Sequence, residues 1–270
     1  MILVTGATGN IGRSLVGRLA GAGAEVRALT RSPGRATVPA GVGVVEGDLE
    51  DPASLRLALT GVEAIFLLRT GDTDTSQILK TAAEAGIARV VTVSSLLAQT
   101  HPGSSVGRTL LRGEQVVRDS GLEWTILRPW EFFSNLLFWA PAIRSDGVVR
   151  APRPGLPSPA IDPRDIASVA ASALLEDGHG GKTYPLTGPA TLTPQEKIAA
   201  ISAALGRPLR FEEDPSLATE DPADDLAAAV SFPGVCAVAS PGALSTVEDV
   251  TGVPATAFRQ WAIEHADSFR

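Results

Sequence analysis

The chain has 270 residues, of which 44% are hydrophobic and 20% are charged, and its formal net charge at pH 7 is −7. This composition predicts a protein that is folded throughout and excludes a disordered one. The negative charge and the lack of a Lys/Arg run argue against nucleic acid or an anionic membrane surface as a partner.

Cysteine use and the N-terminal sequence indicate the compartment. The single cysteine, Cys236, excludes an internal disulfide, and without a Cys/His cluster there is no zinc signature, so we expect no metal. No basic leader precedes the strand-like start at Ile2, and no apolar run reaches the roughly 18 residues of a membrane span. We therefore expect a cytoplasmic protein that does not bind membranes.

The chain opens with a strand, a glycine-rich turn and a helix. Ile2 to Thr5 is a short apolar β-type run, and Asn10 to Ala22 carries apolar residues at helical spacing. Further strands and helices then alternate, which predicts an α/β protein with a doubly wound parallel-sheet Rossmann fold. The predicted strands are Glu25 to Thr30, Val42 to Glu46, Ala64 to Leu68, Arg89 to Ser94 and Trp124 to Leu127, and the predicted helices are Pro52 to Leu59, Asp74 to Ala85 and Ser105 to Ser120.

After Arg128 the alternation breaks. The Pro-rich stretch 151–159 predicts a surface loop or a strap over a cleft, because each proline removes a backbone donor. A helix from Asp162 to Leu175 and a strand from Thr183 to Leu186 then return the chain to the sheet. The remaining predicted elements form a smaller C-terminal α+β part: a helix (Pro194 to Leu205), a short strand (Leu209 to Glu212) and helical material ending in Pro254 to Ala266.

Residues 6–12, GATGNIG, place glycines at G-x-x-G-x-x-G spacing between the first strand and the first helix. The first glycine permits a tight turn, the second lets backbone amides reach a pyrophosphate, and the third permits close packing of helix on strand. Because the whole strand–turn–helix context is present, we predict a dinucleotide site. The predicted cofactor contacts in this turn are Gly6, Thr8, Gly9, Asn10, Ile11 and Gly12.

The end of the second strand indicates which dinucleotide binds. A chain selective for NAD usually carries a carboxylate there, and this chain has Arg31. A guanidinium can bind the 2′-phosphate of NADP through two hydrogen bonds, and Arg35 could contact the same phosphate as a second cation. The alternative is a solvated surface arginine, which suits Arg35 better than Arg31. We predict NADP(H) as the cofactor.

Three further residues at strand ends are predicted to contact the cofactor. Asp48, after the third strand, either accepts a hydrogen bond from the adenine amine or caps the next helix, and both interpretations stay open. Leu68 and Arg69, after the fourth strand, are expected beside the ribose. Arg69 could instead face an acidic group of a substrate.

Six separated motifs occur in a fixed order along nearly the whole chain. They are VTGATGNIG (4–12), GDLED (47–51), VVTVSS (90–95), SGLEWTILRP (120–129), IDPRDIA (161–167) and YPLTGP (184–189). In order and spacing they resemble the NmrA-like branch of the atypical short-chain dehydrogenases/reductases. The resemblance implies a Rossmann domain with a small C-terminal substrate domain. It also implies either an NADPH-dependent reductase, often of quinone-like compounds, or a redox sensor without turnover.

The domain boundaries follow from these elements and from the resemblance. We predict that residues 1–130, completed by 160–187, form the NADP(H)-binding Rossmann domain. Residues 131–159 and 188–270 are predicted to form the substrate-binding C-terminal domain.

The sequence departs from the superfamily at the catalytic dyad. Typical members use Tyr-x-x-x-Lys, in which the lysine lowers the tyrosine pKa from about 10 so that it can exchange a proton. These positions fall here on Val106 and Leu110, neither of which can move a proton, and the only tyrosine, Tyr184, lies in the late strand. Ser95 resembles the third, hydroxyl-bearing member and is a predicted hydrogen-bond donor, and Ser94 beside it is a predicted cofactor contact.

The aromatic segment 128–135 follows the sixth strand, where the carboxyl ends of a doubly wound sheet border the ligand crevice. Its rings could stack on the nicotinamide and on a flat substrate, or they could belong to the core. We expect Phe138 and Trp139 to be packing residues. The predicted contacts are Pro129 and Phe132 with the cofactor, and Trp130 and Phe133 with the substrate.

His101 lies after the fifth strand and is the predicted stand-in for the missing proton donor; the alternative is a solvated loop histidine. Asp162 and Asp165 lie at the start of a helix, so we predict that they cap it and interact favourably with its dipole.

The predicted function is an NADPH-dependent oxidoreductase that transfers hydride to a quinone-like or conjugated carbonyl aromatic substrate. Such acceptors need little acid help, so the missing dyad is compatible with them but counts against alcohol dehydrogenation. A narrower form is a biosynthetic tailoring enzyme. The alternative is a non-catalytic NADP(H) redox-sensing regulator that binds a protein partner. The expected partner is thus a small aromatic or quinone-like molecule, and a homodimer is left open.

Overall fold

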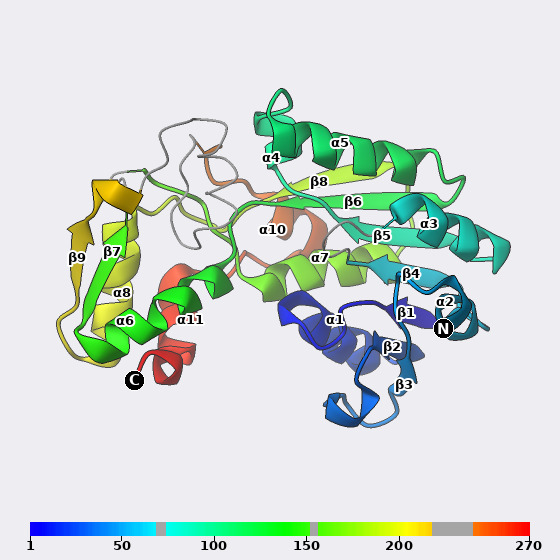
Figure 1. The fold of residues 1–270 in the computed structure, drawn as a ribbon, viewed down its shortest axis with the longest axis horizontal. Helices are drawn as coiled ribbons and strands as arrows, with labels where there is room; N and C mark the ends of the chain where they lie inside the picture. Colours follow the sequence, from blue (N-terminus) through cyan, green and yellow to red (C-terminus); the bar gives the residue numbers. More distant parts are fainter. Residues whose placement is uncertain (69–73, 152–155, 218–239) are drawn as a thin grey trace. The chain divides into compact units, whose positions relative to one another are not determined.

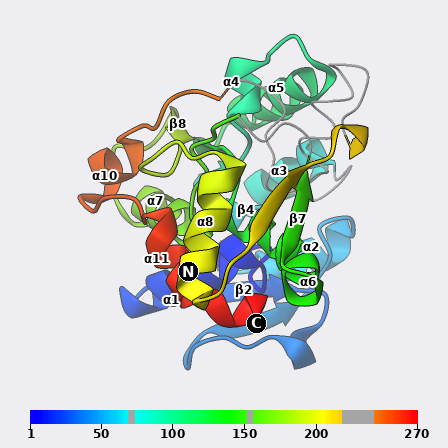
Figure 2. The same ribbon diagram turned by 90° about the vertical axis from the view of Figure 1, so that its left-hand side faces the viewer.

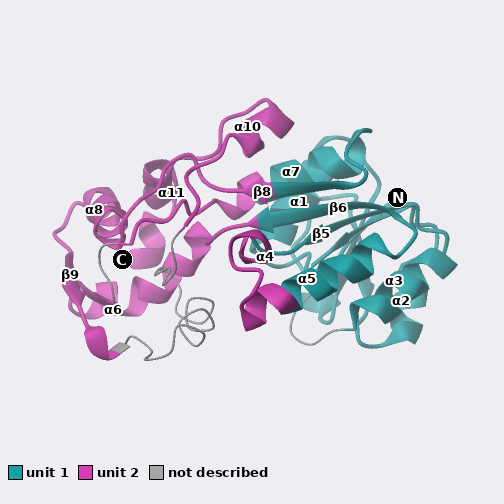
Figure 3. Cartoon of the chain, turned by 90° about the horizontal axis from the view of Figure 1, so that it is seen from above, with its two compact units in different colours: residues 1–95, 109–128, 166–184 teal, residues 96–108, 129–165, 185–270 magenta. Residues whose placement is uncertain are grey.

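In the computed structural model of the chain, residues 1–68, 74–151, 156–217 and 240–270 are described. The chain divides into two compact units (Figure 3). Unit 1 comprises residues 1–95, 109–128 and 166–184, and unit 2 comprises residues 96–108, 129–165 and 185–270.

The larger sheet has the strand order β3-β2-β1-β4-β5-β6-β8 (Figure 1). The five pairings from β3 to β6 are parallel. The order reverses between β1 and β4, and open α/β sheets bind ligands at such a switch point, outside the carboxyl ends of the strands. The predicted doubly wound Rossmann fold is confirmed. The strands are β1 (Ile2–Val4), β2 (Val26–Thr30), β3 (Gly43–Glu46), β4 (Ala64–Leu67), β5 (Arg89–Val93), β6 (Glu123–Pro129) and β8 (Lys182–Leu186).

Helices cover both faces of the sheet in unit 1: α1 and α7 lie on one face, and α2, α3 and α5 on the other (Figure 3). Acidic side chains cap α2 and α3, because the carboxylate of Asp51 accepts from the first turn of α2 and that of Asp74 from the first turn of α3. The helices are α1 (Asn10–Gly21), α2 (Pro52–Ala58), α3 (Thr75–Glu84), α5 (Ser105–Arg118) and α7 (Pro163–Leu175).

One hydrophobic cluster of unit 1 lies between the sheet and the helices α2, α3 and α5. The central strands contribute Leu3, Ile65 and Val90, which are fully buried, as short apolar runs of a parallel sheet must be. The helices contribute an apolar stripe each. The helical members of this cluster include Leu55, Ala58, Ile78, Leu79, Ala82 and Val117.

Unit 2 contains a parallel pair of strands, β7 (Val148–Ala151) and β9 (Arg210–Glu213), beside which α8 runs (Figure 2). Its core is rich in aromatic rings, among them Phe133, Trp139 and Trp261. The other elements outside the large sheet are α4 (Leu97–Thr100), α6 (Ala140–Ser145), α8 (Pro194–Leu205), α10 (Thr246–Thr251), α11 (Phe258–Glu264), η1 (Pro33–Arg35), η2 (Phe133–Trp139), η3 (Pro215–Leu217) and η4 (Ala266–Phe269).

The two aspartates at the start of α7 have different roles. Asp162 accepts from the backbone N–H of Arg164 at 2.8 Å, so it caps the helix as predicted. Asp165 accepts instead from the backbone N–H and the hydroxyl of Thr256, at 2.7 and 3.0 Å, so its predicted capping role is wrong. Burial raises the pKa of Asp165, and the hydrogen bonds from Thr256 offset this only in part.

No helix in the described residues is long and apolar enough to cross a membrane. Nor do three His, Cys, Asp or Glu side chains of that part gather as the ligands of a metal ion would. The assignment of cofactor binding to one predicted domain and of substrate binding to the other stays a prediction.

Candidate functional site

Two positions of the segment between β1 and α1 leave no room for a side chain, Gly6 and Gly12. Gly6 has φ of +60°, which L side chains rarely adopt. A Cβ at Gly12 would lie 2.7 Å from the carbonyl carbon of Gly6, well inside van der Waals contact. Gly9 precedes α1 without a capping side chain, and the first turn of α1 has no acidic residue. The positive end of the helix is therefore left for an external anion.

A pocket of about 190 Å³ lies in unit 1 at the carboxyl ends of β1, β2, β3 and β4. It brings together five of the residues predicted to contact the cofactor: Gly6, Thr8, Arg31, Asp48 and Leu68. The other lining residues, which the sequence analysis missed, are Thr5, Leu29, Thr30, Gly47, Leu49 and Glu50.

Thr5 joins the two strands that flank the switch point. Its side chain is buried, and its Oγ1 accepts from the backbone N–H of Leu68 at 2.8 Å. The backbone N–H of Thr5 donates to the carbonyl of Phe66 at 3.0 Å. The floor of the pocket is therefore held by contacts between the ends of β1 and β4.

Asp48 does not cap α2. Its Oδ1 accepts from the backbone N–H of Glu50 at 3.0 Å, whereas the cap is Asp51, whose Oδ1 accepts from Ala53 at 2.9 Å. The helix-cap alternative for Asp48 is therefore wrong. Asp48 is among the residues that line the pocket, and its contact with the adenine amine stays a prediction.

Arginines follow both the phosphate turn and the end of β2. Arg31 is exposed at the end of β2 and lines the pocket. Arg35 is exposed in η1 and is not among the lining residues that the structure describes. Arg13, which the sequence analysis missed, donates from Nη2 to the carbonyl of Thr8 at 3.2 Å. Its position directly after the third glycine was the available signal. Arg69 lies outside the described residues.

Ser94 belongs to a buried ionic cluster at the ends of β5 and β6. Its Oγ donates to Glu114 of α5 at 2.7 Å, and Arg128 donates to the same carboxylate from Nε at 2.8 Å and from Nη2 at 2.6 Å. Arg118 adds a further bond at 2.9 Å. Burial alone would raise the pKa of Glu114, but these hydrogen bonds outweigh it and lower the pKa. The Ser94 hydroxyl hydrogen is thus directed at Glu114, so a cofactor contact would use its oxygen as an acceptor.

The segment after β6 lies in unit 2 and is extended. Trp130 is 6% exposed, and its backbone N–H donates to the carbonyl of Leu186 at 3.0 Å. Phe132 forms a bridge with Ile161 and is partly buried, and Pro129 is buried. The structure places these predicted contact residues on one continuous stretch.

Phe133 and Phe138 have the reverse of their predicted roles. Phe133 is 2% exposed, and its ring packs against Phe258 and Trp261 with centroids 5.0 and 5.8 Å away. It is a core residue, so the prediction that it contacts substrate is wrong. Phe138, predicted to be a packing residue, is 60% exposed, whereas Trp139 is buried as predicted.

A second buried ionic cluster follows Trp130. The Nζ of Lys197 lies 2.8 Å from Oε2 of Glu131 and 2.8 Å from Oγ of Ser158, and Ser158 also donates to Glu131. The cluster joins three segments of unit 2 that are distant in sequence. The other oxygen of Glu131, Oε1, is buried and has no hydrogen-bond partner among the described residues.

The two predicted catalytic residues are both partly buried. His101 follows α4, and its Nδ1 lies 2.8 Å from Oγ1 of Thr100. Ser95 lies two residues beyond the end of β5. They belong to different units, Ser95 to unit 1 and His101 to unit 2.

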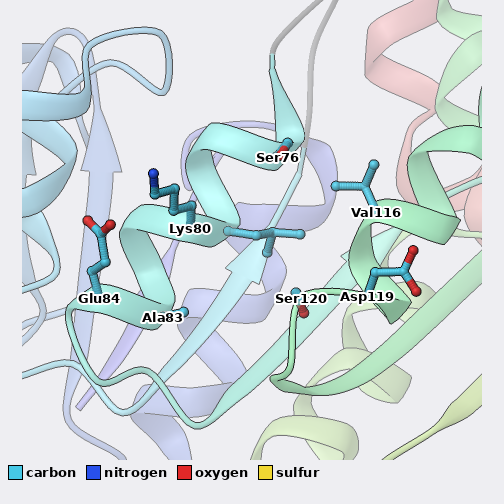
Figure 4. A pocket seen from close by; sticks show the side chains of 8 residues that line it. Ser76, Lys80, Ala83, Glu84, Val116, Asp119 and Ser120 are labelled. Atoms are coloured by element: carbon cyan, nitrogen blue, oxygen red, sulfur yellow. The ribbon is translucent and has the colours of Figure 1, made fainter.

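A larger pocket, of about 490 Å³, lies between α3 and α5 of unit 1 (Figure 4). Leu79, Ala83 and Val116 are its apolar residues, and Lys80, Glu84 and Asp119 are its charged ones. None of the described residues predicted to bind cofactor or substrate lines it.

The reversed strand order, the glycine turn and the pocket at the strand ends define a dinucleotide-binding Rossmann protein. The sequence matches the family described as NAD(P)H-binding over residues 6–177. The chain belongs to this family.

The relatives that match over the full chain include two reductases. The chain is 44% identical to (4-alkanoyl-5-oxo-2,5-dihydrofuran-3-yl)methyl phosphate reductase of Streptomyces griseus, over 100% of this chain and 99% of that one. It is 37% identical to NAD(P)H azoreductase of Xenophilus azovorans, with the same coverage. The NADPH-dependent quinone oxidoreductase of Escherichia coli, solved with NADPH, superposes with a TM-score of 0.81 at 26% identity, over 98% and 99% of the two chains.

These findings confirm the resemblance to NmrA-like atypical short-chain reductases and the predicted enzyme class. The chain is an NAD(P)H-dependent oxidoreductase.

Replacing Gly12 with alanine tests whether the turn holds the cofactor. The added Cβ would meet the backbone of Gly6 and Ala7, so α1 must shift away from the turn. Overpacking of this kind costs about 1–3 kcal/mol, so we expect NADPH affinity to fall by about tenfold or more in a calorimetric titration. Gly17→Ala, also in α1 but with open space at the Cβ, is the matched control and should bind like the wild type.

Proposed function

We propose that this protein is a reductase that uses NADPH in preference to NADH to reduce electron-poor conjugated carbonyl or quinone-like molecules. The observation that carries the proposal is the pocket in which Arg31 lies together with Gly6 and Thr8 of the phosphate turn. Residues 1–130, with 160–187, are assigned to the cofactor, and 131–159 with 188–270 to the substrate.

The positions of two arginines support NADPH. The helix N-terminus and the amides of residues 9–12 suit the pyrophosphate, and Arg13 adds a cation beside the turn. Arg31 at the end of β2 suits the 2′-phosphate, which a carboxylate at that position would repel. Asp48 then suits the adenine amine.

The relatives share one kind of acceptor chemistry, which supports the substrate class. A dihydrofuranone with an alkanoyl group, an azo dye and a quinone are all conjugated acceptors of a hydride. Trp130 and Phe132, on the extended segment after β6, are the side chains suited to stack on such flat molecules. A biosynthetic tailoring role is the narrower form of the proposal.

The reaction requires one proton besides the hydride. When bound, NADPH supplies a hydride, that is, two electrons and one hydrogen nucleus. His101 is the proposed source of the proton, and Ser95 is the proposed hydrogen-bond donor to the acceptor oxygen. The missing Tyr-Lys dyad agrees with acceptors whose reduced form is already stabilised.

The test is to mix the purified protein with NADPH and a panel of quinones, enones and azo dyes and to follow the nicotinamide absorbance. We expect oxidation of NADPH by at least one of these classes, and slower oxidation of NADH. Tight NADPH binding without turnover on the whole panel would contradict the proposal and favour a redox sensor.

A further inference from the structure

The backbone of His101 is fixed by the turn that follows it. Its carbonyl oxygen accepts from the backbone N–H of Ser104 at 3.1 Å and from the Ser104 hydroxyl at 2.8 Å. Gly107 approaches so closely that a Cβ there would lie 2.8 Å from the His101 carbonyl carbon. The ring of His101 therefore projects from an anchored position.

The hydroxyl of Thr100 lies between two partners. Its Oγ1 is 3.2 Å from the carbonyl oxygen of Leu96, one helical turn earlier, which can only accept, and 2.8 Å from Nδ1 of His101. When the single hydroxyl hydrogen is donated to Leu96, Thr100 can only accept from His101, and Nδ1 then carries the ring hydrogen.

This arrangement defines one tautomer. In it, neutral His101 carries its hydrogen on Nδ1 and a lone pair on Nε2, so protonation of the ring adds a hydrogen at Nε2. Arg108 is the charged side chain that the described contacts place on this turn, where it donates to the carbonyl of Gly103. In the described part of the chain, no carboxylate forms a hydrogen bond or an ion pair with the His101 ring, in contrast to His179, which lies 3.9 Å from Glu176.

We propose that Thr100 is a positioning residue that fixes His101 in the Nδ1–H tautomer, so that Nε2 holds and delivers the proton of the reduction. This inference rests on the proposed function. In the step, a hydride adds to the conjugated acceptor, the Nε2–H bond of the imidazolium breaks, and its proton forms an O–H or C–H bond on the reduced product. The imidazole is left neutral with its hydrogen on Nδ1, and water restores the second proton.

The first test reads the tautomer without catalysis. Long-range nitrogen–proton NMR spectra of the ¹⁵N-histidine-labelled protein should show His101 in the Nδ1–H form at high pH. His265 is an internal reference, because its Nδ1 lies 2.9 Å from the carbonyl of Trp261 and must also carry a hydrogen. Thr100→Val should release His101 into a mixture of tautomers. A wild-type His101 in the Nε2–H form would overturn the proposal.

The second test connects the tautomer to turnover. Loss of a positioned proton donor typically costs about 10²-fold, so His101→Asn should lower kcat by roughly that factor, and Thr100→Val by about tenfold with unchanged KM for NADPH. Thr100→Ser keeps the hydroxyl and should restore most of kcat. The matched control is Thr60→Val, which should leave kcat unchanged. Thr60 lies at the end of another helix, and its hydroxyl similarly donates to a carbonyl one turn earlier, that of Arg56 at 3.5 Å.

The double variant distinguishes positioning from a structural role. In a protein that already carries His101→Asn, adding Thr100→Val should not lower kcat further. A further tenfold loss of kcat in that background would overturn the proposal. If the wild type oxidises NADPH with no acceptor of the panel, both the proposed function and the proposed proton delivery are wrong. The tautomer of His101 is tested separately, by the NMR spectrum alone.

Discussion

Replacing Lys197 with methionine is expected to lower the free energy of unfolding by about 3–5 kcal/mol, because it leaves a buried carboxylate without its cation. The side chains of Lys197 and Glu131 are only 2% and 10% exposed, and their charged atoms are 2.8 Å apart. Water cannot replace the lost partner at so small an exposure. Denaturant unfolding measures the loss.

Two variants control this experiment. Combining Glu131→Gln with Lys197→Met removes both charges, so we expect most of the stability to return. Lys182→Met, at an exposed lysine, should change stability by no more than about 0.5 kcal/mol. A loss below about 1 kcal/mol for Lys197→Met would show that the pair contributes little.

Replacing Arg31 with alanine is expected to weaken NADPH binding by about 100-fold and to leave NADH binding nearly unchanged. Charge-assisted hydrogen bonds contribute about 1.5–3 kcal/mol, and only NADPH has the 2′-phosphate that would accept them. Calorimetric titration with both dinucleotides measures the difference.

Arg35→Ala is the matched control, because Arg35 is exposed in the next turn and is not among the described residues lining the pocket. It should keep most of the NADPH affinity. Equal losses of NADPH and NADH affinity in Arg31→Ala would contradict the assignment of Arg31 to the 2′-phosphate.

The sheet could be predicted because each of its strands has a recognisable local sequence pattern. The buried segments 2–4 and 64–67 are continuous apolar runs, and the helical spacing of apolar residues identified α1 and α8. Unit 2 gave weaker signals. β7 is four residues long, and η2 lies in the nearly continuous apolar run FFSNLLFW, where no periodicity shows which ring turns inward. The sequence of this run therefore does not distinguish buried Phe133 from exposed Phe138.

The phosphate turn could also be predicted, since its glycines are contiguous and their spacing has a mechanical reason. The contacts that the sequence did not reveal join residues far apart along the chain. Thr5 binds Leu68, 63 residues later, and Glu131 binds Lys197, 66 residues later. No local pattern encodes such pairs. The hydrogen bonds of Asp48 and Asp51, by contrast, depend on a loop geometry that the motif GDLED leaves open.

The division into units has a consequence for dissecting the protein. The boundaries fall after residues 95, 108, 128, 165 and 184, so each unit is assembled from three stretches and β6, β8, α5 and α7 each continue from one into the other. No single cut yields either half intact. Truncation, fusion or recombination at one position would leave both halves incomplete, so new specificities have to be introduced by point substitutions within the whole chain rather than by exchanging modules.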